Sequence, residues 1–437
     1  MKKHILFLVL LAASASLSAS QNYILRYTES EPLSQFLARY QLIRQNSVAG
    51  RPVHLVRDPL RRDPALLIRQ ISDATDDGVS IEVDQTVSLP IRTLRSRQMG
   101  GYDSLLSAMS RRRTLPFFGL GAPEGVVTQA GLRQVRADLS WSAHGLGSGV
   151  VAIVDTGVDS THPLLSSRTV RGLDLLTPSG TGSELAGLTP EQRALINPTT
   201  TPLLAAPRYL SNGHAAFFEA GVASHPLSST LPIGLGHGTM TAGAVILVAP
   251  NARIMPVRAF HLSGLGSLFT VIQALHMSRA RGAKVINLSM STVSQSTEFI
   301  RSIDELSDEG AIIVASTGNE GRLNPVSYLA QTRKATGIAS VDSQFRRSLF
   351  SNAGSGITWA AAPGEALLLP FPGGRWAGGW GTSFSAPLAS GLAAKTLRRK
   401  PDATYSDLQS LLGKSRTHPD QNLGLGVLDV YESMNGI

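Results

Sequence analysis

Short, almost uninterrupted apolar runs recur from about residue 130 onward, and they constrain the fold more than any other feature of the sequence. The runs cover residues 150–154, 253–259, 283–288, 311–315 and 338–341, and segments with helical periodicity lie between them at 268–281 and 298–306. Apolar strands that alternate with helices are typical of a parallel sheet covered on both faces. The sequence therefore predicts an α/β fold for residues 120–437, with a mostly parallel central sheet flanked by helices.

The part of the chain before residue 120 has a different sequence pattern. Residues 21–89 alternate strand and helix patterns, which predict a compact α+β unit. Residues 90–119 are rich in Arg and Ser with little periodicity, which is typical of a basic, protease-sensitive linker. Within the larger region, residues 177–231 are rich in Pro, Thr, Ser, Gly and Ala and predict an insertion made of loops.

The N-terminus carries the features of an export signal. Two lysines and a histidine precede the apolar residues 5–13, and small residues follow as far as Ser20. This order predicts a signal peptide over residues 1–20 and a secreted product, extracellular or periplasmic. A membrane anchor is disfavoured because the apolar run is much shorter than the ~20 residues that span a bilayer. We therefore expect no membrane association after the signal is removed.

Composition excludes several kinds of site. The chain has no cysteine, so disulfides, thiolate nucleophiles and Cys-ligated metals are ruled out. The net charge is +9, but residues 1–113 hold 16 Lys or Arg against 10 Asp or Glu, a net +6. Since most of the basic excess lies outside the α/β region, we expect no nucleic-acid partner. A covalent nucleophile must be a Ser, Thr, Lys or acidic residue.

Three glycine-punctuated segments carry candidate catalytic side chains. Asp155 ends an apolar run and precedes Thr-Gly, His237 lies between two glycines, and Ser383 precedes the apolar segment 388–397. Each alone is compatible with a turn or a helix cap. Together they supply an acid, an imidazole and a hydroxyl, and a serine hydroxyl needs an oriented imidazole to attack a peptide carbonyl. The three segments therefore indicate nucleophilic acyl transfer.

These segments resemble the signature blocks of the subtilisin-like serine proteases, the subtilases. Residues 151–159 resemble the family's aspartate block, 236–239 its histidine block and 381–387 its serine block, in the family's order. Residues 316–321, Ser-Thr-Gly-Asn-Glu-Gly, resemble the block that carries the oxyanion-hole amide, and residues 285–290 resemble the strand that lines the substrate cleft. The resemblance covers nearly all of residues 130–437.

The resemblance implies a secreted serine endopeptidase that hydrolyses protein or peptide substrates through an acyl-enzyme intermediate. It assigns catalysis to Asp155, His237 and Ser383, the oxyanion hole to Asn319, and substrate binding to Ser289, Met290, Ser291 and Gly318. It also implies that residues 21–89 are a ferredoxin-like propeptide that inhibits the enzyme intramolecularly. We expect a monomer, no cofactor for the chemistry and no metal in the site. The family commonly binds structural calcium through scattered loop oxygens, and the sequence does not assign its ligands here.

The chain departs from the family pattern at several positions. Met240 and Thr241 stand where the family commonly has a second histidine and a valine, and Leu388 stands where it usually has histidine. Met290 and Ser291 replace a common apolar residue and glycine, which affects the expected subsite preference. None of these changes removes a catalytic group. The interval between the aspartate and histidine blocks is longer than in compact members, and the excess lies in residues 177–231.

Other interpretations of the same segments are weaker. Asp155-Thr156-Gly157 also matches the aspartic-protease tripeptide, but that mechanism needs a second such motif and the sequence has none. Asn287-Leu288-Ser289 fits a glycosylation acceptor, but it falls on a predicted buried strand. A secreted binding protein on a degenerate protease scaffold is the alternative from another class. The complete triad and Asn319 argue against it.

Overall fold

The computed structural model describes residues 21–90 and 100–437, except 102–103, 106, 109–110, 112, 178–179, 197–207, 210–214, 218–230, 291–294, 331 and 436. The predicted signal peptide therefore lies outside the described residues. The chain divides into two compact units, Met1–Asp84 and Gln85–Ile437.

The described part of the first unit is an α+β sandwich. Its elements in chain order are β1 (Asn22–Tyr27), α1 (Leu33–Tyr40), β2 (Ile43–Ser47), β3 (Val53–Arg57), α2 (Pro64–Ser72) and β4 (Val79–Val83). They form an antiparallel sheet in the order β2-β3-β1-β4, which is the arrangement of ferredoxin-like units. Tyr23, Leu25, Phe36 and Leu67 are buried between sheet and helices. The sequence does not predict β2, because this edge strand is polar and largely exposed.

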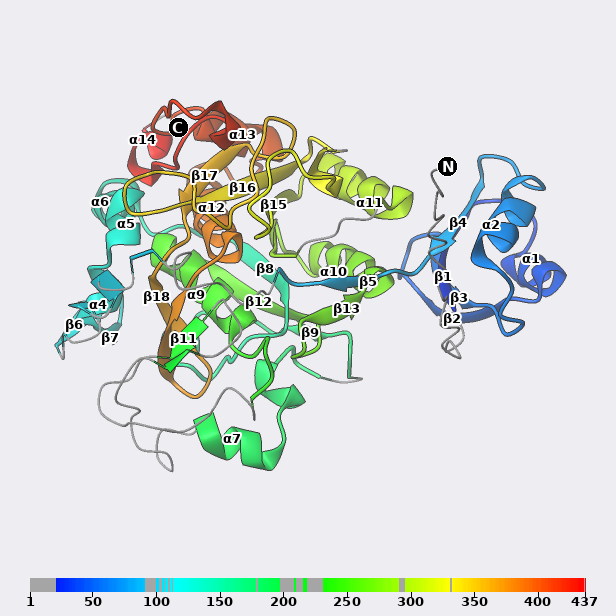
Figure 1. Ribbon diagram of the computed structural model, residues 1–437, viewed down its shortest axis with the longest axis horizontal. Coiled ribbons are helices and arrows are strands. Elements are labelled where there is room, and N and C mark those ends of the chain that lie inside the picture. The colour runs from blue at the N-terminus through cyan, green and yellow to red at the C-terminus, as the bar shows by residue number, and fades with distance from the viewer. Residues whose placement is uncertain are drawn as a thin grey trace, which may run out of the picture. The chain divides into compact units, whose positions relative to one another are not determined.

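A seven-stranded parallel sheet forms the centre of the second unit (Figure 1), which confirms the predicted α/β fold. Its order is β17 (Ala360–Pro363), β16 (Ala335–Val341), β15 (Ile312–Ser316), β14 (Val285–Leu288), β8 (Val150–Asp155), β12 (Arg253–Arg258) and β9 (Leu173–Asp174). Nearly all of the residues in these strands are buried, as their continuous apolar sequences require. Because all neighbouring strands are parallel, their carboxyl ends meet at one edge of the sheet.

Two central helices carry candidate catalytic residues at their first turns. They are α9 (His237–Val248) and α12 (Thr382–Arg399), which pack against each other and against the sheet. Every residue of α9 and almost every residue of α12 is buried, so neither helix has a polar face. The helices that follow α9 in the chain, besides α12, are α10 (Leu268–Ala280), α11 (Thr297–Asp308), α13 (Tyr405–Leu412) and the short α14 (Val430–Met434). Figure 1 shows α10 and α11 on the face of the sheet opposite α12.

Pro387 lies inside α12, which begins at Thr382. A proline at this point cannot donate to the carbonyl four residues earlier, which belongs to Ser383. The Ser289 hydroxyl donates to that carbonyl instead, at 3.2 Å. The helix therefore begins at Thr382, several residues before the apolar segment.

Smaller elements surround this core. Four strands form an antiparallel sheet in the order β10 (Arg208–Tyr209), β11 (Ala215–Phe217), β19 (Arg375–Gly379) and β18 (Leu367–Phe371), and hairpin β6 (Thr114–Phe117)–β7 (Leu120–Pro123) precedes the helices α4 (Glu124–Val127), α5 (Ala130–Gln134) and α6 (Ala137–His144). The described parts of the 177–231 insertion contain β10, β11, helix α7 (Pro190–Ile196) and a 3₁₀ turn, Glu184–Gly187. The insertion thus holds short regular elements as well as loops.

The last residues of the predicted propeptide and parts of the predicted linker also contribute structure to the second unit. Strand β5 (Thr86–Ser88) pairs with β13 (Leu265–Ser267), Leu105 is buried in the core, and β6 begins at Thr114. Residues 85–89 therefore group with the α/β body, although their sequence places them in the small N-terminal unit.

Candidate active site

The aspartate and histidine candidates meet at the carboxyl edge of the sheet. Asp155 is the last residue of β8, and His237 is the first residue of α9. Nδ1 of His237 lies 2.8 Å from each carboxylate oxygen of Asp155, and both side chains are buried. The backbone N–H of Thr156 also donates to Asp155 Oδ1, at 2.7 Å. A carboxylate facing Nδ1 favours the tautomer with the proton on Nδ1, which leaves Nε2 as the basic nitrogen.

Glycines flanking His237 permit this close approach. Gly236 has a φ of 89°, in the left-handed region that disfavours other residues. A Cβ on Gly238 would lie 2.0 Å from the carbonyl oxygen of Gly157. Any larger residue at position 238 would push α9 away from the end of β8.

The serine candidate lies in the first turn of α12. Ser383 is fully buried, and the N-cap residue Gly381 has a φ of 148°. The ring centroids of His237 and Phe384 are 5.7 Å apart, so the first turns of α9 and α12 adjoin. Among the described residues, Ser383 Oγ forms no hydrogen bond. The serine–imidazole bond of a triad is therefore not formed here, and such bonds often tighten only when substrate is bound.

Asn319 follows β15 at the same edge and is held in one orientation. Its Oδ1 accepts hydrogen bonds from the backbone N–H of Thr382 at 2.9 Å and from the Thr382 hydroxyl at 2.8 Å. Because both donors face Oδ1, Nδ2 must point the other way, and it donates to the carbonyl oxygen of Pro90 at 2.9 Å. The orienting role of Thr382 is not evident from the sequence, although the residue immediately precedes Ser383.

Strand β5 and the two residues that follow it place the Pro90 carbonyl beside Nδ2 of Asn319. In the antiparallel ladder of β5 and β13, Val87 pairs with Gly266. The N–H of Leu89 donates to the Gly264 carbonyl at 2.9 Å. Val87 and Leu89 are both buried. A segment of the chain thus follows β13 and ends with a peptide carbonyl at Asn319.

The predicted substrate-binding residues lie near this edge where they are described. Ser289 and Met290 follow β14 and are fully buried, while Ser291 lies outside the described residues. The N–H of Gly318 donates to the Thr382 hydroxyl at 3.2 Å. A cavity lined by Met290, Thr317 and Glu320, among others, opens between these segments.

A buried glutamate is the residue that the sequence analysis misses. Glu184, in the 177–231 insertion, is fully buried and accepts hydrogen bonds from residues of both the aspartate and the histidine blocks. Burial raises the pKa of Glu184 to about 7, against the hydrogen bonds from Thr156 and Thr239, which lower it. No local pattern marks an isolated glutamate in a loop-rich segment.

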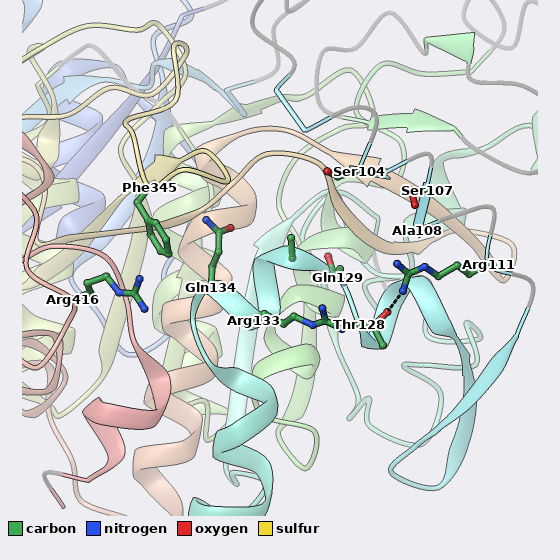
Figure 2. A pocket seen from close by; sticks show the side chains of 11 residues that line it. Ser104, Ser107, Ala108, Arg111, Thr128, Gln129, Arg133, Gln134, Phe345 and Arg416 are labelled. Atoms are coloured by element: carbon green, nitrogen blue, oxygen red, sulfur yellow. Dashed lines mark hydrogen bonds between the residues drawn. The ribbon is translucent and has the colours of Figure 1, made fainter.

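A larger cavity, about 700 Å³ in volume, has a different lining (Figure 2). Three arginines, Arg111, Arg133 and Arg416, line it, and Figure 2 shows Arg111 bonded to Thr128. Its lining residues include no acid and no histidine, so the cavity lacks the groups for acid–base catalysis. The catalytic candidates lie elsewhere.

Within the described residues, no group of three or more His, Cys, Asp or Glu side chains is placed to hold a metal ion. Within the same residues, no helix is long and apolar enough to cross a membrane.

Comparisons with known proteins agree on one family. The sequence model of the subtilase family matches residues 147–426. M-protease of Shouchella clausii (strain KSM-K16) is 24% identical over 431 residues, covering 96% of this chain and 91% of its own. Thermitase of Thermoactinomyces vulgaris is 30% identical over 266 residues, covering 61% of this chain and 80% of its own.

A solved structure has a fold similar to that of this chain. Fervidolysin from Fervidobacterium pennivorans, described as a keratinolytic enzyme related to subtilisin, superposes with a TM-score of 0.67 at 18% identity. The match covers 96% of this chain but only 61% of fervidolysin. At this identity the likeness shows a shared fold alone.

Proposed function

Because the chain belongs to the subtilase family and is a subtilisin-like serine endopeptidase, we propose that it cleaves protein substrates with a triad of Asp155, His237 and Ser383. The observation that carries the proposal is the peptide carbonyl of Pro90 at the amide of Asn319, beside the first turn that holds Ser383. A peptide group in this position is the reactant that the triad requires.

Acylation begins at the serine. Ser383 Oγ attacks the carbonyl carbon of the bound peptide, and Nε2 of His237 takes the hydroxyl proton. Asp155 holds the imidazole by the 2.8 Å contacts to Nδ1 and stabilises the imidazolium that forms. When the tetrahedral intermediate collapses, the C–N bond breaks and His237 gives its proton to the leaving amine. Water then attacks the acyl-enzyme by the same proton transfers and releases the acid.

Two donors face the developing oxyanion in this mechanism. One is Nδ2 of Asn319, which the two bonds from Thr382 aim toward the peptide carbonyl. The other is the backbone N–H of Ser383, because the first N–H groups of a helix have no intrahelical acceptor. Such donors stabilise charge that is present only in the transition state. Every group in this mechanism belongs to the chain, so the proposed chemistry needs no cofactor.

The proposed function is tested with a serine variant and a matched control. Ser383→Ala should lose nearly all hydrolysis of a protein substrate such as casein, while remaining folded. Ser385→Ala is the control, because Ser385 is equally buried in the same helix and its hydroxyl donates to the Pro363 carbonyl. This variant should retain most activity. A Ser383→Ala protein with wild-type turnover would refute the triad, and a wild type that is still inactive once residues 1–90 have been removed would favour the non-catalytic binding protein.

Residues 21–89 are proposed to act as an intramolecular inhibitor, through the segment that leads to Pro90. Strand β5 pairs with β13, and the residues after it bring the Pro90 carbonyl to Asn319, where a substrate carbonyl would otherwise lie. The enzyme is therefore blocked until the peptide bond between Pro90 and Ile91 is hydrolysed. This arrangement is consistent with a protein that is exported by a signal peptide at residues 1–20 and is inactive until it is processed.

N-terminal sequencing of the secreted protein tests this part of the proposal. The wild type should yield a product that begins at Ile91, whereas Ser383→Ala should keep the bond between Pro90 and Ile91 intact. A wild-type product that retains residues 85–90 and is fully active would contradict inhibition by this segment.

A further inference from the structure

One buried carboxyl outside the triad connects two of its three blocks. Glu184 begins the 3₁₀ turn Glu184–Gly187, and its side chain has no exposed surface. A buried carboxylate is costly unless hydrogen bonds satisfy its oxygens. The hydrogen-bond donors around Glu184 therefore show which parts of the structure this side chain connects.

Each carboxylate oxygen of Glu184 accepts two hydrogen bonds. Oε1 accepts from the Thr156 hydroxyl at 2.5 Å and from the Gly236 N–H at 2.8 Å. Oε2 accepts from the Thr239 N–H at 3.2 Å and from the Thr239 hydroxyl. Thr156 follows Asp155 in the chain, and Gly236 and Thr239 lie on either side of His237. One side chain thus connects the end of β8 to the start of α9.

The two threonine hydroxyls donate to Glu184, and the oxygen of each accepts from a backbone N–H. The Thr156 hydroxyl oxygen accepts from the Gly238 N–H at 3.2 Å. The Thr239 hydroxyl oxygen accepts from the Asp159 N–H at 2.9 Å. With its oxygen engaged by a backbone donor, the Thr239 hydroxyl directs its proton to Glu184. The Thr156 hydroxyl has two carboxylate acceptors, Glu184 Oε1 at 2.5 Å and Asp155 Oδ1 at 3.2 Å. Glu184 is therefore the acceptor for four donors.

We propose that Glu184 is a positioning residue that holds the turn around His237 against the strand end that carries Asp155. It keeps the Asp155–His237 hydrogen bond formed while the imidazole exchanges protons with Ser383. This role rests on the proposed triad. It also gives the 177–231 insertion a function, since the residue that connects the two blocks comes from it.

Glutamine cannot replace Glu184 in this network. Each oxygen of Glu184 faces one backbone N–H, from Gly236 on one side and from Thr239 on the other. In either orientation of a glutamine amide, its NH₂ group would face one of these N–H groups. One buried donor would lose its acceptor, and the turn before or after His237 would have to shift. Aspartate keeps both acceptor oxygens at a shorter reach.

The test compares Glu184→Gln, Glu184→Asp and the control Glu191→Gln. Glu191 lies on α7 of the same insertion and is exposed. Because displacements of about 1 Å at a catalytic group can cost about 100-fold in rate, we expect Glu184→Gln to lower kcat by roughly 10- to 100-fold with little change in KM. Glu184→Asp should recover part of the loss, and Glu191→Gln should match the wild type.

A second readout does not depend on hydrolysis. The proton that Nδ1 of His237 shares with Asp155 should give a downfield resonance in ¹H NMR of the wild type and of Glu191→Gln. In Glu184→Gln this resonance should move upfield or broaden. If Glu184→Gln does not accumulate as folded protein, Glu184→Asp takes its place, with a smaller shift of the same sign.

The outcomes distinguish this inference from the proposed function. An unchanged resonance together with an unchanged kcat in Glu184→Gln would overturn the positioning role. A defect confined to KM, or a loss of thermal stability with a normal resonance, would also overturn it. If even the wild type fails to hydrolyse peptides, the proposed function fails, and the resonance still decides whether Glu184 positions His237.

Discussion

Replacing Asn319 by aspartate exchanges the donor that faces the Pro90 carbonyl for an acceptor and preserves the shape of the side chain. Oδ1 can keep both of its hydrogen bonds from Thr382. The second carboxylate oxygen then takes the position of Nδ2, 2.9 Å from the carbonyl oxygen. Asn319→Leu removes the donor without adding a charge. Comparing the two variants therefore separates the loss of the hydrogen bond to the oxyanion from the repulsion between the oxyanion and a carboxylate.

The structure sets the size of each effect. A hydrogen bond to a charged group contributes about 1.5–3 kcal/mol, so Asn319→Leu should lower kcat by roughly 10- to 150-fold. In Asn319→Asp, a carboxylate 2.9 Å from the oxyanion adds a repulsion of about 6 kcal/mol at an effective dielectric constant of ~20. That repulsion corresponds to a further decrease in kcat of up to about 10⁴-fold relative to Asn319→Leu. We therefore expect activity in the order Asn, Leu, Asp.

Steady-state kinetics on a peptide substrate provides the assay, with thermal unfolding to verify that each variant is folded. KM should change little, because the lost interaction strengthens only in the transition state. Asn422→Asp, in the 3₁₀ turn Gln421–Leu423, serves as the control for an isosteric amide-to-acid change and should leave kcat unaltered. An Asn319→Asp enzyme that is faster than Asn319→Leu, or a defect seen only in KM, would refute the oxyanion role.

Two further predictions concern packing and pH. Gly238→Ala should lower Tm and abolish hydrolysis, since the new Cβ would lie 2.0 Å from the Gly157 carbonyl oxygen; a Tm and activity equal to the wild type would contradict this. Burial, with nearby Arg399 and Arg398, lowers the pKa of Lys395 from 10.5 to about 8. Between these pH values the unfolded chain binds more protons, so this group makes the free energy of unfolding rise with pH. Urea denaturation at pH 8 and 10.5 should show a smaller rise for Lys395→Met, and equal slopes would argue against a depressed pKa.

The sequence predicts the parts of the fold and site that depend on local pattern. Apolar runs identify the buried strands of the parallel sheet, and the comparisons confirm the family resemblance. Asp155 follows such a run directly, Asn319 follows one after a short turn, and His237 and Ser383 lie among glycines. Each of these residues is thus marked by its immediate neighbours in the chain.

Features that depend on distant contacts are not predictable in this way. Glu184 meets Thr156 and Thr239 only after the insertion folds back on the sheet edge. The pairing of β5 with β13 joins residues far apart in sequence, so local pattern does not show that residues 85–89 pack with the second unit. The hydrogen bond from Ser289 to the Ser383 carbonyl, which Pro387 cannot donate to, also joins residues far apart in sequence.

Covalent labelling with an active-site serine phosphonate tests the central claim most directly. The processed wild-type protein should take up one phosphonate per chain, and mass spectrometry of its peptides should locate the adduct on Ser383. His237→Ala should label far more slowly, since the hydroxyl then lacks its base. An adduct on another residue, or labelling of Ser383 at the same rate without His237, would contradict the account.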